Sequence, residues 1–153
     1  MRPMYESEDD RANEDKIRRA IEERLGVFLH KLPTSYGIDY VATSDPTGMG
    51  LVGWYEVKFR SGMTWGQYPD VMVSVLKLRA AAGLRVSTDR PAMFAVADQS
   101  GETRVASLCD TRPDWIRFGG RTSQTRDPAD VEPVCHIPLD RFVPLKDIPR
   151  WDR

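Results

Sequence analysis

Two short stretches, GIDYVAT at residues 37–43 and LVGWYEVKFR at residues 51–60, decide the fold of this chain. Both are rich in β-branched and aromatic residues, which favour strands. The linker between them, SDPTGMG at residues 44–50, consists mostly of turn-forming residues. The two stretches therefore predict an antiparallel hairpin.

The predicted hairpin brings three charged side chains together. If its loop is centred on residues 47–48, Asp39 pairs with Glu56, and directly opposed side chains lie on one side of a sheet with Cβ atoms about 5 Å apart. Lys58 joins that side because strand side chains alternate with a period of two. Opposed carboxylates destabilise a purely structural sheet, and a divalent cation resolves this conflict. Two interpretations are open: a metal site to which Val57 adds its carbonyl oxygen, or solvated acids with Lys58 in a cross-strand ion pair.

The rest of the sequence predicts further helices and strands around this hairpin. Apolar residues at helical spacing without Gly or Pro indicate helices, and short apolar runs bounded by turn residues indicate strands. Pro69 suits a first helical turn, and Gly83 suits a helix exit. In chain order the predicted elements are a helix at 7–25, strands at 27–32, 37–43 and 51–60, a helix at 69–82, and strands at 91–97 and 103–108.

Length and composition indicate one globular domain. The 153 residues, 41% of them hydrophobic and 29% charged, are enough for a single core. Beyond residue 110 the periodicity fades and prolines recur, which predicts an extended tail with one edge strand near 134–139. We therefore expect a single domain over residues 1–153, with a core at about 8–110 and a tail at 111–153. The expected fold class is α/β, with a mixed central sheet flanked by two helices and an irregular C-terminal tail.

Charge and hydropathy limit the possible partners. No run of about 18 apolar residues is present, so we expect no membrane span, and the acidic start MRPMYESEDD is unlike a signal peptide. A cytoplasmic protein is therefore expected. The net charge of -1 argues against binding nucleic acid by bulk electrostatics, so any such contact must be local.

Asp39, sixteen intervening residues and then Glu56, Val57 and Lys58 resemble the signature of the PD-(D/E)XK nuclease superfamily. The predicted order of elements matches the αβββαβ core of that restriction-endonuclease-like family over about residues 8–98. Ile38 departs from the pattern, because the family motif has Pro there. The resemblance implies a deoxyribonuclease that hydrolyses phosphodiester bonds with Mg²⁺, or Mn²⁺ in its place. In that family the two acids hold the metal and the lysine assists the attacking water.

Members of this family often take a further acid from the first helix, and Glu14 matches that position. At 100° per residue, Glu14 lies on the same stripe as Ile17 and Ile21, so it points towards the sheet and needs a partner. That partner is the metal or a metal-bound water in one interpretation, and an arginine in the other. Asp10, one turn earlier, is the second candidate for this catalytic and metal-binding position.

Four further residues are candidates for contact with nucleic acid. Gln67 and Tyr68, just before the second predicted helix, resemble a polar pair in exonuclease-like members. Lys77 either steers a phosphate or is a solvated lysine, and Arg121, in the stretch FGGRT, either contacts a phosphate or follows a glycine turn. The tail resembles the ends of small phage-encoded proteins, which implies a phage protein that processes or recombines DNA in the host cytoplasm.

Three functions compete at this stage. The first is a metal-dependent nuclease on DNA, and related nucleases often form homodimers to cut two strands. The second is a catalytically silent protein of the same fold that binds nucleic acid or a host protein. The third is an acidic interaction protein whose N-terminal helix is the binding surface. The intact set of Asp39, Glu56 and Lys58 favours the first.

Overall fold

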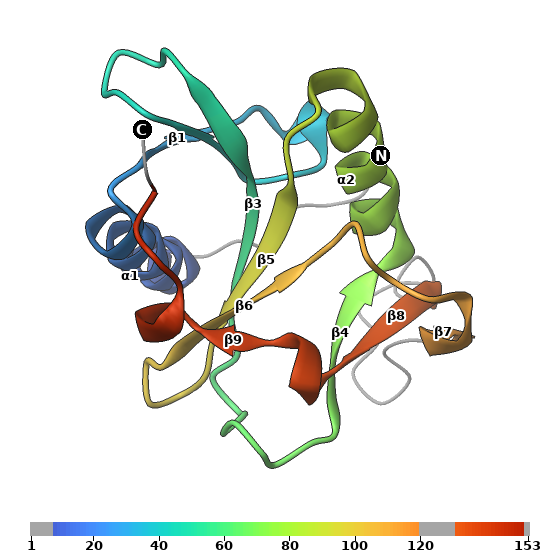
Figure 1. Cartoon of the computed structure of the whole chain (residues 1–153). Helices are drawn as coiled ribbons and strands as arrows, with labels where there is room; N and C mark the ends of the chain where they lie inside the picture. Colours follow the sequence, from blue (N-terminus) through green and yellow to red (C-terminus); the bar gives the residue numbers. More distant parts are fainter. Residues whose placement is uncertain (1–7, 120–130, 152–153) are drawn as a thin grey trace.

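A mixed six-stranded sheet forms the centre of the molecule in the computed structural model, which describes residues 8–119 and 131–151 (Figure 1). Its strand order is β1-β2-β3-β5-β6-β9. All neighbouring strands are antiparallel except β3 and β5, which are parallel. The strands are β1 (Phe28–Lys31), β2 (Tyr40–Thr43), β3 (Leu51–Phe59), β5 (Ala92–Ala97), β6 (Thr103–Ser107) and β9 (Val143–Pro144).

The register of the β2–β3 hairpin confirms the prediction from the sequence. Tyr40 pairs with Tyr55 and Val41 with Trp54, so the next positions along, Asp39 and Glu56, are opposite each other. The strand β2 begins one residue later than Asp39. The acid therefore lies at the point where the chain enters the sheet.

One face of the sheet packs against helix α1 (Glu8–Leu25). The sequence places Ile17, Ile21 and Leu25 at helical spacing, and all three are buried against a face of the sheet that includes Val57 and Ala95. Burial of such side chains contributes about 1.5–3 kcal/mol each. The prediction of a first helix at 7–25 is thus confirmed to within one residue.

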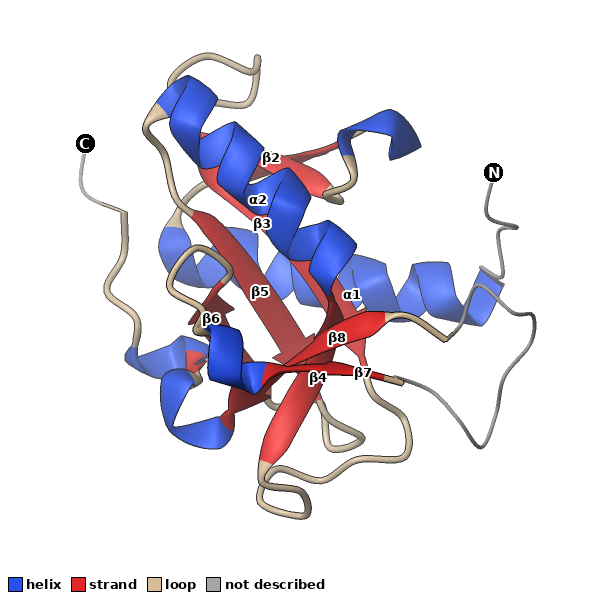
Figure 2. Ribbon diagram, turned by 90° about the vertical axis from the view of Figure 1, so that its right-hand side faces the viewer, coloured by secondary structure: helices blue, strands red, loops and turns tan. Residues whose placement is uncertain are grey.

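The opposite face carries helix α2 (Val75–Thr88) and a second, three-stranded sheet, as Figure 2 shows. In this sheet β8 (Pro133–Pro138) lies between β4 (Asp70–Ser74) and β7 (Ile116–Phe118). Its inward side chains, together with Leu78 and Ala81 of α2, form one core cluster with Phe94 and Val96 of the main sheet. Both faces of the main sheet are therefore covered.

The prediction of a helix over 69–82 is wrong for its first half. Residues Asp70–Ser74 form strand β4, in which Val71 and Val73 are buried and their neighbours are partly exposed. Pairing with β8 supplies the backbone hydrogen bonds of this segment. The helix begins only after Ser74, whose hydroxyl accepts a hydrogen bond from the amide of Leu76. It also continues through Gly83, the predicted exit, to Thr88.

The C-terminal tail contributes more regular structure than the sequence predicts. The strand expected at the edge, near 134–139, is β8, the middle strand of the second sheet. Its two prolines are at its first and last residues, Pro133 and Pro138, where a missing amide is tolerated. The tail then returns to the main sheet, where β9 pairs with β6.

No helix within residues 8–119 and 131–151 is long and apolar enough to cross a membrane.

Candidate active site

Asp39 is fixed to β3 through its side chain. The backbone carbonyl of Asp39 accepts a hydrogen bond from the amide of Leu32 at 2.8 Å. Its carboxylate oxygen Oδ2 accepts one from the amide of Val57 at 2.9 Å. Val57 is the residue after Glu56 on β3. The Asp39 carboxylate thus accepts the hydrogen bond that a backbone carbonyl of a neighbouring strand would otherwise accept from the Val57 amide.

Glu56 is a buried acid on the central strand β3, with 9% of its surface exposed. Its Oε2 lies 3.2 Å from the ammonium of Lys77 on α2. Lys77 in turn donates a hydrogen bond to the carbonyl oxygen of Gly37 at 2.9 Å. The second carboxylate oxygen, Oε1, is buried and has no hydrogen-bond partner among the described residues. Such a buried polar atom without a partner is energetically unfavourable and points to a missing ligand.

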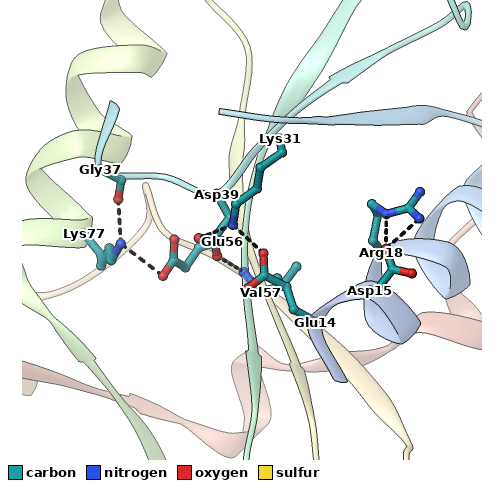
Figure 3. A network of polar contacts seen from close by, with 9 residues as sticks. All are labelled: Glu14, Asp15, Arg18, Lys31, Gly37, Asp39, Glu56, Val57 and Lys77. Carbon is teal, nitrogen blue, oxygen red and sulfur yellow. Dashed lines mark hydrogen bonds and ion pairs between the residues drawn. The ribbon is translucent and has the colours of Figure 1, made fainter. Parts of the chain in front are cut away.

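Lys31 connects the first helix to this acid pair, as Figure 3 shows. Its ammonium lies 2.5 Å from Oε1 of Glu14 and 3.5 Å from Oδ1 of Asp39. It also lies 5.0 Å from the centre of the Tyr40 ring. Glu14 therefore points towards the sheet as predicted, and its partner is a lysine rather than the arginine considered from the sequence.

The environment of Glu56 favours the protonated form of its carboxyl group. Burial, followed by the negative charge of Asp39, raises the pKa of Glu56 to about 8, and Lys77 opposes this shift. A protonated acid next to a charged one is the expected state of two close carboxylates without a cation. A divalent ion would reverse the balance, because it stabilises both negative charges.

The residues fit a hard divalent cation. Mg²⁺ is commonly held by one or two carboxylates, with water and substrate phosphate completing its shell. Asp39 and Glu56 supply two such groups, and Oε1 of Glu56 has a free coordination position. No cluster of three or more His, Cys, Asp or Glu side chains able to hold a metal occurs within the part of the chain that the structure describes.

Comparison with known families decides the relationship. A family model described as "Phage putative PDDEXK endonuclease" matches residues 1–145. The chain belongs to the PDDEXK endonuclease family. The match confirms the family resemblance that the sequence shows at Asp39, Glu56 and Lys58. The proteins of this family are described as nucleases.

A solved structure shows the same fold. The PDDEXK chain is similar to Hjc of Archaeoglobus fulgidus, a Holliday junction resolvase from an archaeal hyperthermophile, with a TM-score of 0.54 and 12% sequence identity. The match covers 92% of this chain and 98% of that one. At this identity the likeness supports the restriction-endonuclease-like fold. No curated protein matches the chain.

The other residues predicted for the site are not linked to the acid pair by the contacts described above. Lys58 is two residues beyond Glu56 on β3, on the same side by alternation, and is exposed. Gln67 accepts a hydrogen bond from the amide of Thr64 at 3.0 Å, and Tyr68 is 52% exposed. This pair precedes strand β4 and not a helix, contrary to the prediction. Arg121 lies outside the described residues.

Two lysines at the site had roles that the sequence did not reveal. Lys77 was considered only as a phosphate contact or a solvated lysine, but its ammonium pairs with Glu56. The sequence pattern does not mark Lys31 as a residue of the site. A signal was present, because the β1–β2 pairing sets Lys31 opposite Tyr40, next to Asp39. The metal-binding role of Glu14 and of the Val57 carbonyl stays a prediction.

Proposed function

We propose that this member of the PDDEXK family is a Mg²⁺-dependent deoxyribonuclease, with Mn²⁺ able to replace Mg²⁺, that processes or recombines phage DNA in the host cytoplasm. One observation carries the proposal: Glu56 is buried beside a second acid and keeps one carboxylate oxygen without a partner among the described residues. Such an arrangement suits cation binding far better than it suits a structural role.

Asp39 and Glu56 would hold the ion, with the carbonyl of Val57 as a third oxygen ligand. When bound, the ion lowers the pKa of a coordinated water and neutralises charge on the phosphate oxygens. The amide of Val57 keeps the Asp39 carboxylate in place at 2.9 Å. The ammonium of Lys77 holds the other acid by its Oε2 and leaves Oε1 available.

Lys58 would act on the substrate. Its exposed ammonium, on the Glu56 side of β3, can donate to a phosphate oxygen and orient the attacking water. Glu14 supports the site through Lys31, which it holds at 2.5 Å. This contact keeps the Lys31 ammonium beside Asp39 and limits the repulsion between the acids.

The test is a cleavage assay with and without Mg²⁺ on single-stranded, duplex and branched DNA. We expect wild-type protein to cut at least one substrate only when Mg²⁺ is present. Lys58→Ala is expected to lower the rate by about 10²–10⁴-fold, the usual contribution of a positioned proton-transfer group. Lys146→Ala, at an exposed lysine of the tail, serves as the matched control and should retain full activity.

Equal cleavage by wild type and Lys58→Ala would contradict the proposed role of Lys58. Binding of DNA without cleavage of any substrate would favour the catalytically silent alternative. A homodimer is part of the proposal, since two copies allow both strands of a duplex to be cut. Sedimentation of the protein with and without DNA measures it.

A further inference from the structure

An open groove of about 460 Å³ runs along α2. One wall is the helical turn at Thr34–Tyr36 and the residue after it, which contribute Ser35, Tyr36 and Gly37 to the lining. The other wall is one face of α2, from Leu76 through Arg79 and Gly83 to Ser87. In Figure 1 this turn lies beside α2.

Both walls of the groove lead into the candidate active site. On one side Gly37 precedes Asp39 by two residues. On the other side Lys77 directly follows Leu76 and pairs with Glu56. A hydrogen bond of 2.9 Å from Lys77 to the carbonyl of Gly37 joins the two walls at this end. Gly37 of the groove is thus linked through Lys77 to Glu56, so the groove lies beside the candidate active site.

The lining has the chemistry that recognises a nucleotide. Tyr36 is 47% exposed, so its ring is available for stacking on a base. Arg79 supplies a cation for a phosphate, and Ser35 and Ser87 supply hydroxyl groups. None of the described residues that line the groove is acidic. Aromatic stacking combined with a cationic contact is the usual way in which proteins bind unpaired strands.

We propose that this groove binds a short unpaired stretch of DNA next to the bond that is cut. The inference rests on the proposed nuclease function and adds a substrate class to it, namely ends or junctions with unpaired nucleotides. The eleven-residue step from Leu76 to Ser87 spans about 16 Å of helix, enough for a few nucleotides. The net charge of -1 supports local stacking over a broad charged duplex track.

The test is fluorescence anisotropy in EDTA, so that binding is measured without cleavage. The probes are a blunt duplex and the same duplex with a single-stranded overhang. Gly83→Trp fills the groove, and a side chain at Gly83 meets nothing within 4 Å, so the helix can accept it. Val86→Trp places the same ring on α2 at a residue that is 86% exposed and does not line the groove, and it is the matched control.

We expect Gly83→Trp and Tyr36→Ala to weaken binding of the overhang duplex roughly 5- to 100-fold, as loss of base stacking does. Binding of the blunt duplex should change little. Arg79→Ala should lower the dependence of log K on log salt by about 0.7, the value for one phosphate contact on a single strand. Arg85→Ala, on the same helix but outside the groove, should leave that slope unchanged.

Unchanged binding of the overhang duplex by Gly83→Trp would overturn the proposal, and so would an equal loss on both duplexes. Neither result would affect the proposed nuclease function. That function is tested separately, by Mg²⁺-dependent cleavage and by the loss of activity in Lys58→Ala. Conversely, a protein that binds overhangs through this groove and cuts nothing would refute the nuclease and keep the groove.

Discussion

The proposed chemistry depends on the carboxyl group of Glu56. Its pKa of about 8 arises from burial and from the charge of Asp39. An ordinary glutamate has a pKa near 4.5. Without a bound metal ion, Glu56 of the folded protein therefore keeps its proton between about pH 4.5 and 8, whereas the unfolded chain loses it. This difference makes both stability and metal binding depend on pH.

The first prediction concerns Glu56→Gln in EDTA. Because the folded pKa is raised, the wild type is favoured below the unfolded pKa of 4.5 and loses stability as the pH rises to about 8. The amide cannot ionise and avoids this loss. We expect the variant to exceed the wild type by about 1–3 kcal/mol at pH 9 and to gain less at pH 5, measured by urea unfolding.

The control for this experiment is Glu23→Gln, at an exposed glutamate of α1. It should follow the pH profile of the wild type. A Glu56→Gln variant that gained the same free energy of unfolding at pH 5 and pH 9 would disprove the raised pKa.

The second prediction concerns protons released by metal. At pH 7, below the pKa of Glu56, binding of Mg²⁺ should release close to one proton per site, because a metal ligand must be deprotonated. Calorimetry in buffers of different ionisation enthalpy measures this number. Release should fall towards zero above pH 9, and Glu56→Gln should show none at any pH. Proton release by the Gln variant would assign the effect to another group.

At the scale of elements, local sequence determined the hairpin and long-range pairing determined the rest. A loop centred on residues 47–48 gives the register that places Asp39 opposite Glu56. This register holds from Tyr40 to Ala42, and an irregularity between Ala42 and Thr43 shifts it next to the loop. Strand β4 could not be predicted in the same way. Val71, Met72 and Val75 also fit the apolar face of a helix. The pairing partner β8 is about sixty residues further along the chain.

The ion pairs of Lys77 with Glu56 and of Lys31 with Glu14 also depend on long-range packing, so the sequence alone could not predict them. Lys77 reaches Glu56 only because α2 packs across β3, and the sequence does not specify that distance. Lys31 reaches Glu14 only because α1 packs against β1 and β3. Periodicity predicted which way Glu14 points, but it could not predict which cation would meet it.

The third prediction tests the boundary between β4 and α2. Ser74 ends the strand and caps the helix, with its hydroxyl accepting from the amide of Leu76 at 3.1 Å. Ser74→Ala should lower the free energy of unfolding by about 0.5–2 kcal/mol, and Ser74→Asp should recover most of it. Thermal or urea unfolding provides the measurement. Ser87→Ala, late in the same helix, is the control, and an equal effect there would refute the cap.

At the scale of the whole molecule, the tail connects the two cores. Phe142 packs on the α2 side, with its ring centre 5.4 Å from that of Trp65 and 6.3 Å from that of Phe94. Leu145, three residues later, is buried in the cluster on the α1 side. Between them β9 pairs with β6 and forms the edge of the main sheet. The tail thus passes around the edge of the main sheet and adds one buried side chain to the core on each face.

The fourth prediction follows from this arrangement. Phe142→Ala should lower the free energy of unfolding by about 3–5 kcal/mol and Leu145→Ala by about 2–5 kcal/mol, because each leaves a cavity in a separate core. In the double variant the losses should add to within about 0.5 kcal/mol, since the sites share no cluster. Val143→Ala, at a side chain that is 45% exposed, is the control with little effect. Strong coupling between the two losses would show that the cores are not separate.

The bond from the Val57 amide to the Asp39 carboxylate has a consequence for how this protein can evolve. A one-residue slip of the hairpin, or an apolar residue at 39, deprives that amide of its acceptor on a central strand. Asp39 is therefore tied to folding as well as to the proposed chemistry. A lineage that abandons DNA cutting should accordingly retain an acid or amide at position 39 long afterwards.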